Sequence, residues 1–146
     1  MTSVTTRPAT DLAPERGAAA YRVFSVLTGV AALAVLLQGL WAGLFLREGT
    51  YDDTWVGVHS IGGMIAALLA LIATIIAFVQ LRARRDIVIG SVVFTLLLIL
   101  EIILGGTISD SHAVWAQAIH IPLALFLMGG AVALPLRARG VGRTAA

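Results

Sequence analysis

Four apolar stretches, each about as long as a bilayer-spanning helix, occupy most of this chain of 146 residues. A helix needs roughly 20 apolar residues to cross the hydrocarbon, and only helices or closed barrels satisfy their backbone hydrogen bonds in lipid. The stretches are continuous and do not alternate with polar residues, which indicates helices. The sequence therefore predicts an all-α, four-transmembrane-helix bundle with spans at about residues 23–46, 55–81, 87–108 and 115–136.

Composition places the whole chain in one membrane domain. Only 12% of the residues are charged and 59% are apolar, whereas about a quarter of a soluble domain is charged. We expect the membrane domain to cover residues 23–137, which leaves no soluble catalytic domain. The polar, Thr-, Ala- and Pro-rich residues 1–22 predict a disordered cytoplasmic tail, and residues 138–146 a second cytoplasmic tail.

The arginines predict the orientation in the membrane. All ten basic residues are arginine, and only Arg47 lies in the connection after the first span or the one after the third. The positive-inside rule then places both termini and the connection after the second span in the cytoplasm of a multi-pass protein of the plasma membrane, here a bacterial inner membrane. We interpret the basic residues as orientation signals beside membrane lipid and expect no nucleic-acid partner. The other nine are Arg7, Arg16, Arg22, Arg82, Arg84, Arg85, Arg137, Arg139 and Arg143.

The chain shows a weak internal repeat that places two histidines in corresponding positions. One half reads "LLQGLWAGLFLREGTYDDTWVGVHSIGG" and the other "LLILEIILGGTISDSHAVWAQAIHIP", and each half ends in Leu-Arg-Ala-Arg. Each contains a helix, a short acidic connection, a Trp and a His four or five residues later, at His59 and His120. Two such halves predict parallel repeats related by an axis along the membrane normal, with both histidines at similar depth.

These two histidines are the candidate metal ligands. Ionisable residues inside a span are costly and usually face the protein interior, and the spans keep only His59, His120 and Glu101. Neutral imidazole is a common axial ligand of haem iron, and helical bundles build such sites on facing helices. The alternative for a single histidine is a tolerated, hydrogen-bonded residue near the interface. The matched pair predicts a non-covalent haem b, because the absence of cysteine excludes C-x-x-C-H attachment, thiolate sites and disulfides.

Two pairs of glycines could let a flat macrocycle approach the helices. Gly62 and Gly63 follow His59 on the same helix face, and Gly105 and Gly106 lie near the end of the third span. Packing of small residues between membrane helices is the alternative explanation. Trp41, Trp55 and Trp115 are most simply interfacial anchors, and His112 a solvated residue of the last connection.

Glu101, in "LLLILEIILGG", is the strongest single outlier in the spans. Its expected role is a hydrogen bond to a ligand histidine or proton transfer. A neutral carboxylic acid that joins two helices is the alternative, since a carboxyl group alone in lipid stays protonated.

The segments "WVGVHSIGGMIAALLAL" and "LILEIILGGTISDSHAVWAQAIHIPLALFL" resemble one four-helix half of the heme A synthase family over about residues 25–136. In that family each half carries a His near the outer end of its second and fourth helices, and the pair can ligate a haem. The resemblance therefore implies that His59 and His120 are haem ligands. Because the chain corresponds to only one of the two fused halves of that family, it also implies a homodimer. The chain is also similar to small uncharacterised four-helix membrane proteins of actinobacteria.

The resemblance does not extend to the family's catalytic residues. Val56 and Ser60 stand where a catalytic Glu and an Arg are expected around the histidine of the second helix, and Glu101 stands where a Gln is expected. We therefore expect no catalytic residue and no heme A synthesis.

The sequence thus predicts a bis-His, b-type haem protein of the membrane that acts in electron transfer or haem sensing, with a quinone or redox protein as electron partner. Haem propionates need donors, and the side of the acidic connections offers Arg47, Tyr51 and His112. The alternatives are a cofactor-free scaffold subunit and a small proton-coupled transporter that uses Glu101.

Overall fold

The computed structural model describes residues 12–45 and 53–142, with the backbone alone at 12–16 and 139–142. The described chain consists of four helices: α1 (Leu12–Phe45), α2 (Asp53–Gln80), α3 (Arg85–Ser111) and α4 (Val114–Gly142). Each contains a segment long and apolar enough to cross a bilayer, and no strand occurs in the described ranges. The predicted all-α bundle of four spans is confirmed, and the chain is a multi-pass membrane protein.

The first and last helices extend beyond the predicted spans. Residues 12–22 belong to α1, so the prediction of a disordered tail is wrong for this part, while residues 1–11 lie outside the described chain. The Ala-rich run Ala18–Ala20 favours helix, and Pro14 lies in the first turn, where its missing N–H costs nothing. At the other end, α4 continues through residues 138–142.

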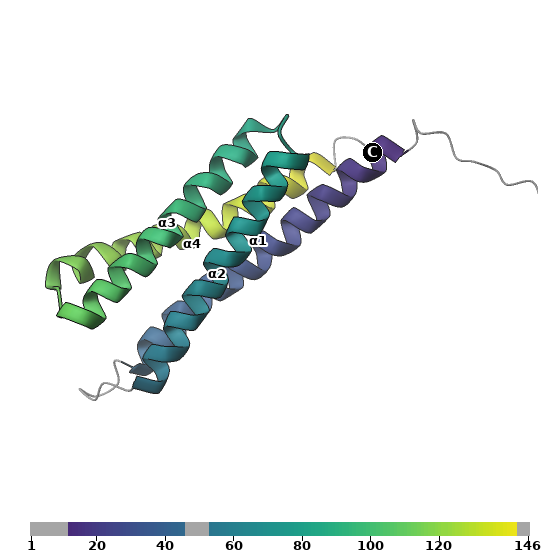
Figure 1. Cartoon of the computed structure of the whole chain (residues 1–146). Coiled ribbons are helices and arrows are strands. Elements are labelled where there is room, and N and C mark those ends of the chain that lie inside the picture. Colours follow the sequence, from purple (N-terminus) through teal and green to yellow (C-terminus); the bar gives the residue numbers. More distant parts are fainter. Residues whose placement is uncertain (1–11, 46–52, 143–146) are drawn as a thin grey trace, which may run out of the picture.

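The helices form two hairpins, α1–α2 and α3–α4, that pack against each other. The main contacts join α1 to α2 and α4, and α3 to α2 and α4, so α2 and α4 lie on a diagonal. Figure 1 shows the hairpins close together at the 81–84 turn, where the N-terminal end of α1 and the C-terminal end of α4 also lie. We call this the turn end. The hairpins diverge toward the α1–α2 and α3–α4 connections, which we call the loop end (Figure 1).

Two apolar clusters fill the bundle from its turn end to its middle. Small residues on α2 (Ala66, Ala70, Ala73 and Ala77) are buried and let the neighbouring helices approach closely. Phe24 and Ile87 are fully buried near the turn end, and Phe94 lies in the cluster at mid-bundle. Large apolar side chains also cover the outside, as expected of a surface that faces lipid.

A hydroxyl cluster joins α2 to α3 inside the bundle. Thr74 Oγ1 donates to the Ala70 carbonyl (2.8 Å) and lies 3.1 Å from the Ser91 carbonyl and 2.9 Å from Thr95 Oγ1. Hydrogen bonds between membrane helices average about 0.6 kcal/mol each, so the cluster supports the packing of small side chains and does not replace it.

The connection between α3 and α4 is tight. His112 is the C-cap of α3, in the left-handed conformation with φ 51°, and its N–H donates to the Ile108 carbonyl at 2.9 Å. The residue is exposed, as predicted. Arg47 and Tyr51, named above as donors to propionates, lie outside the described residues.

Candidate functional site

A cavity of about 430 Å³ opens between the two hairpins in the loop-end half of the bundle. We call it the interhairpin slot. The apolar clusters do not extend to the loop end, and the slot occupies the divergence seen in Figure 1. Small and apolar side chains from all four helices surround a few polar groups. The lining residues are Val35, Gln38, Gly39, Ala42, His59, Ser60, Gly63, Met64, Ala66, Leu98, Glu101, Ile102, Gly105, Gly106, His120, Ile121, Ala124, Leu125, Leu127 and Met128.

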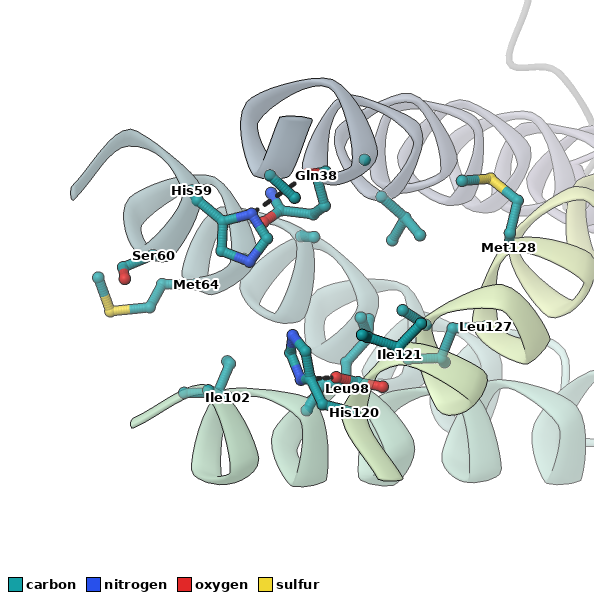
Figure 2. A pocket seen from close by; sticks show the side chains of 18 of the residues that line it. Gln38, His59, Ser60, Met64, Leu98, Ile102, His120, Ile121, Leu127 and Met128 are labelled. Atoms are coloured by element: carbon teal, nitrogen blue, oxygen red, sulfur yellow. Dashed lines mark hydrogen bonds and ion pairs between the residues drawn. The ribbon is translucent and has the colours of Figure 1, made fainter. Parts of the chain in front are cut away.

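The two histidines face each other across this slot. His59 comes from α2 and His120 from α4, so each hairpin supplies one imidazole. Their ring centroids are 6.3 Å apart, with an angle of 62° between the ring planes. Figure 2 shows one nitrogen of each ring turned toward the other ring. The structure therefore brings together the two histidines that the repeat pairs.

His59 is held against α1 by Gln38 and Phe45. Its Nδ1 lies 3.2 Å from the Gln38 backbone carbonyl, and its ring meets the edge of Phe45 at a centroid distance of 5.4 Å. A carbonyl oxygen only accepts, so it bonds to Nδ1 when that nitrogen carries the hydrogen.

The side chain of Gln38 contacts the backbone of α2 at the same place. In the amide orientation that gives both the oxygen and the nitrogen of the side chain a partner, Nε2 donates to the His59 carbonyl (2.8 Å) and faces His59 Nδ1 as a donor (3.1 Å), while Oε1 accepts from the Gly63 N–H (3.1 Å). His59 Nδ1 therefore has both an acceptor and a donor of Gln38 beside it. Gln38 therefore fixes the helical turn that carries His59. Gln38 was not among the site residues predicted from the sequence.

His120 is held against α3 by Glu101. The Glu101 carboxylate is in direct contact with His120 Nδ1. Glu101 is only 8% exposed, because it lies on the buried face of α3 with Leu98 and Leu104. Apart from this contact, neither carboxylate oxygen has a hydrogen-bond partner among the described residues. Of the roles expected for Glu101, the structure favours the contact with a candidate ligand histidine.

The four candidate glycines divide into two groups. Gly63, Gly105 and Gly106 line the slot, as the macrocycle hypothesis requires. Gly62 does not line it: this glycine is buried against α1, where a Cβ would collide with the Trp41 indole. Gly62 therefore serves helix packing, the alternative considered for all four. Trp41 has a packing role as well.

The two half-sites correspond through the repeat. Gln38 precedes His59 by 21 residues and Glu101 precedes His120 by 19. Each comes from the first helix of its hairpin and contacts the histidine of the second. The repeat that paired the histidines therefore also contained the signal for Gln38.

Two imidazoles are the candidate metal ligands of the site. Among the described residues, no group of three or more His, Cys, Asp or Glu is placed to hold a metal ion. Comparisons with protein-family models, curated proteins and solved structures found no match. The resemblance to heme A synthase stays a prediction, and the function must be argued from the slot.

Proposed function

We propose that this chain is a b-type haem protein of the membrane that holds one non-covalent haem between His59 and His120. The facing imidazoles carry the proposal. Two trans imidazoles bonded to one metal ion at roughly 2.0 Å each place their ring centroids about 6 Å apart, and the observed separation is 6.3 Å. A molecule that spanned the gap by hydrogen bonds at both ends would need more room, because each N–H···O contact alone covers about 2.9 Å.

The slot suits a flat macrocycle. Its volume of about 430 Å³ falls within the range of about 300–1,000 Å³ that is typical of small-molecule sites. Both hairpins contribute glycines to the walls, and a Cβ on Gly39 or Gly106 would meet no atom within 4 Å. His59 and His120, one from each hairpin, would hold the metal of such a macrocycle. The ring nitrogens of the macrocycle would supply the other ligands of its metal, so two ligands from the protein would be enough.

The supporting contacts fit the ligand role. Metal-bound histidines usually donate their second ring N–H to a carbonyl or carboxylate, which fixes the tautomer and the ring orientation. His59 has the Gln38 carbonyl in this position and His120 has the Glu101 carboxylate. Both Nε2 atoms are then available inside the slot.

Closed axial positions favour electron transfer or haem sensing over chemistry on a bound substrate. Haem, when bound, supplies a one-electron iron couple whose potential is set by its axial ligands and surroundings. His59 and His120 would hold the iron, and the apolar lining of the slot would limit access of water. A quinone or a redox protein is the proposed electron partner.

The test is an optical spectrum of the purified protein, expressed with haem supplied, in the oxidised and dithionite-reduced states. We expect a Soret band and sharp reduced α and β bands, which both His59→Ala and His120→Ala abolish. His112→Asn is the matched control, because His112 is exposed and Asn tolerates its positive φ. This variant should keep the spectrum of the wild-type protein.

A folded, monodisperse wild-type protein without colour would contradict the proposal. A cofactor-free scaffold would then be the better explanation, since it should tolerate loss of both histidines. A proton-coupled transporter would instead lose flux with Glu101→Gln.

A further inference from the structure

The two half-sites correspond in position but differ in charge. At Nδ1 His59 faces only neutral groups of Gln38, its backbone carbonyl at 3.2 Å and its side-chain amide at 3.1 Å, whereas His120 contacts the carboxylate of Glu101. Gln38 and Glu101 lie on the first helices of the two hairpins, 21 and 19 residues before the histidines, and they differ in charge. Symmetric hairpins therefore present two imidazoles that are held by chemically unequal partners.

Glu101 has no other partner that would explain its burial. The residue is 92% buried, from an exposed fraction of 8%. Its oxygens have no hydrogen-bond donor among the described residues beyond the contact with His120. Burial of a carboxyl group without a partner is costly, so the contact with the ring accounts for its tolerance inside a span.

We infer that Glu101 is the positioning residue of His120: it holds Nδ1–H toward α3, keeps the Nε2 lone pair directed at His59, and makes His120 the more strongly electron-donating of two unequal ligands. The position of the ring hydrogen on His120 is a property of the chain without any cofactor. The claim about electron donation rests on the proposed haem binding. A carboxylate that accepts from Nδ1–H increases the electron donation of the ring to a bound metal, which would stabilise the oxidised iron and lower its potential.

The tautomer of His120 tests whether Glu101 positions the ring. A histidine without a special partner prefers hydrogen on Nε2 in water, so Nδ1–H requires an acceptor at that position. Glu and Gln both present an oxygen there, whereas Leu presents none. Glu101→Gln should therefore preserve the tautomer of His120 and remove only the negative charge, and Glu101→Leu should lose both.

The first experiment is nitrogen NMR of ¹⁵N-histidine-labelled full-length protein, purified without haem in detergent. The expected result is Nδ1–H at His120 in the wild-type protein and in Glu101→Gln, and Nε2–H in Glu101→Leu. Thr95→Val is the matched control, since it removes another buried polar group of α3 that does not line the slot. An unchanged tautomer in Glu101→Leu would overturn the inference.

The second experiment is a redox titration of the haem-loaded proteins. Glu101→Gln should shift the midpoint potential to more positive values, by about 59 mV for each tenfold change in the one-electron reduction equilibrium, while Thr95→Val should leave it unchanged. Equal potentials in the wild-type protein and Glu101→Gln would overturn the unequal-ligand part. A wild-type protein that takes up no haem would contradict the proposed function instead, and the NMR result would still decide the role of Glu101.

Discussion

The contact between Gly62 and α1 gives a prediction that does not depend on any cofactor. Changing Gly62 to Ala adds a Cβ that would collide with the Trp41 indole and lie 2.6 Å from Gln38 Nε2. Real Cβ atoms essentially never come within 3.0 Å of another heavy atom, so α1 or the indole must move. Overpacking of this kind costs about 1–3 kcal/mol.

Two opposing contributions, helix propensity and steric overlap, determine how much stability Gly62→Ala loses. Replacement of Gly by Ala inside a helix is worth roughly 1 kcal/mol in favour of the variant. The collision involves a rigid ring and not the end of a flexible chain, which places the cost near the upper end of its range. We therefore expect Gly62→Ala to lose about 2 kcal/mol of the free energy of unfolding. The matched control is Gly29→Ala, where a Cβ meets no atom within 4 Å and no loss is expected.

The assay is unfolding of the detergent-solubilised protein by increasing SDS, followed by circular dichroism. Displacement of α1 also moves Gln38, which contacts the turn that carries His59, so the proposed haem band should weaken in the same variant. Equal stability of Gly62→Ala and Gly29→Ala would refute the argument, because it would mean that the α1–α2 interface yields at no cost.

Four further predictions concern the bundle and the slot. Thr74→Val should cost about 1 kcal/mol by removing the hydroxyl contacts to α3, whereas Thr107→Val, whose exposed hydroxyl bonds only within its own helix, should be neutral; the SDS assay measures both. Gly105→Leu should abolish haem binding without unfolding the protein, because its side chain grows into the slot beside His120, and Gly129→Leu, where a Cβ meets open space outside the slot, should keep the spectrum. Haem at 100 times its dissociation constant should raise the free energy of unfolding by about 2.7 kcal/mol, and metal-free protoporphyrin, which has no axial bonds to offer, should raise it less. The proposed homodimer predicts a doubled native mass in mild detergent, and a monomer alone would contradict it.

The sequence predicted the spans well because hydropathy reports directly on burial in lipid. It failed at the start of α1, where residues 12–22 are polar enough to suggest a tail but continue the helix toward the turn end. Lipid burial and helix propensity are separate properties, and a hydropathy pattern reads only the first. The orientation of the termini stays a prediction from the arginines.

The candidate site was predicted in part. His59 and His120 were found because the repeat placed them in corresponding positions, and the structure brings them together. Gln38 was missed because a single Gln among apolar residues carries no charge and seemed unremarkable for a membrane helix. Gly62 and Gly63 are adjacent, yet one packs against α1 and the other lines the slot. A sequence cannot separate these roles, because about 100° of rotation around the helix axis divides them.

The chemistry of the slot argues for an occupant. The chain lines this cavity with glycines on both walls, and it places two imidazoles and a carboxylate inside. Lipid chains could fill the apolar part but would leave the inward-facing nitrogens of both imidazoles without partners. A ligand that is flat and apolar around its edge, with a Lewis-acidic centre, would fill the cavity and use the imidazoles together. Haem combines these properties, and this is the physical reason for proposing it over a cofactor-free bundle.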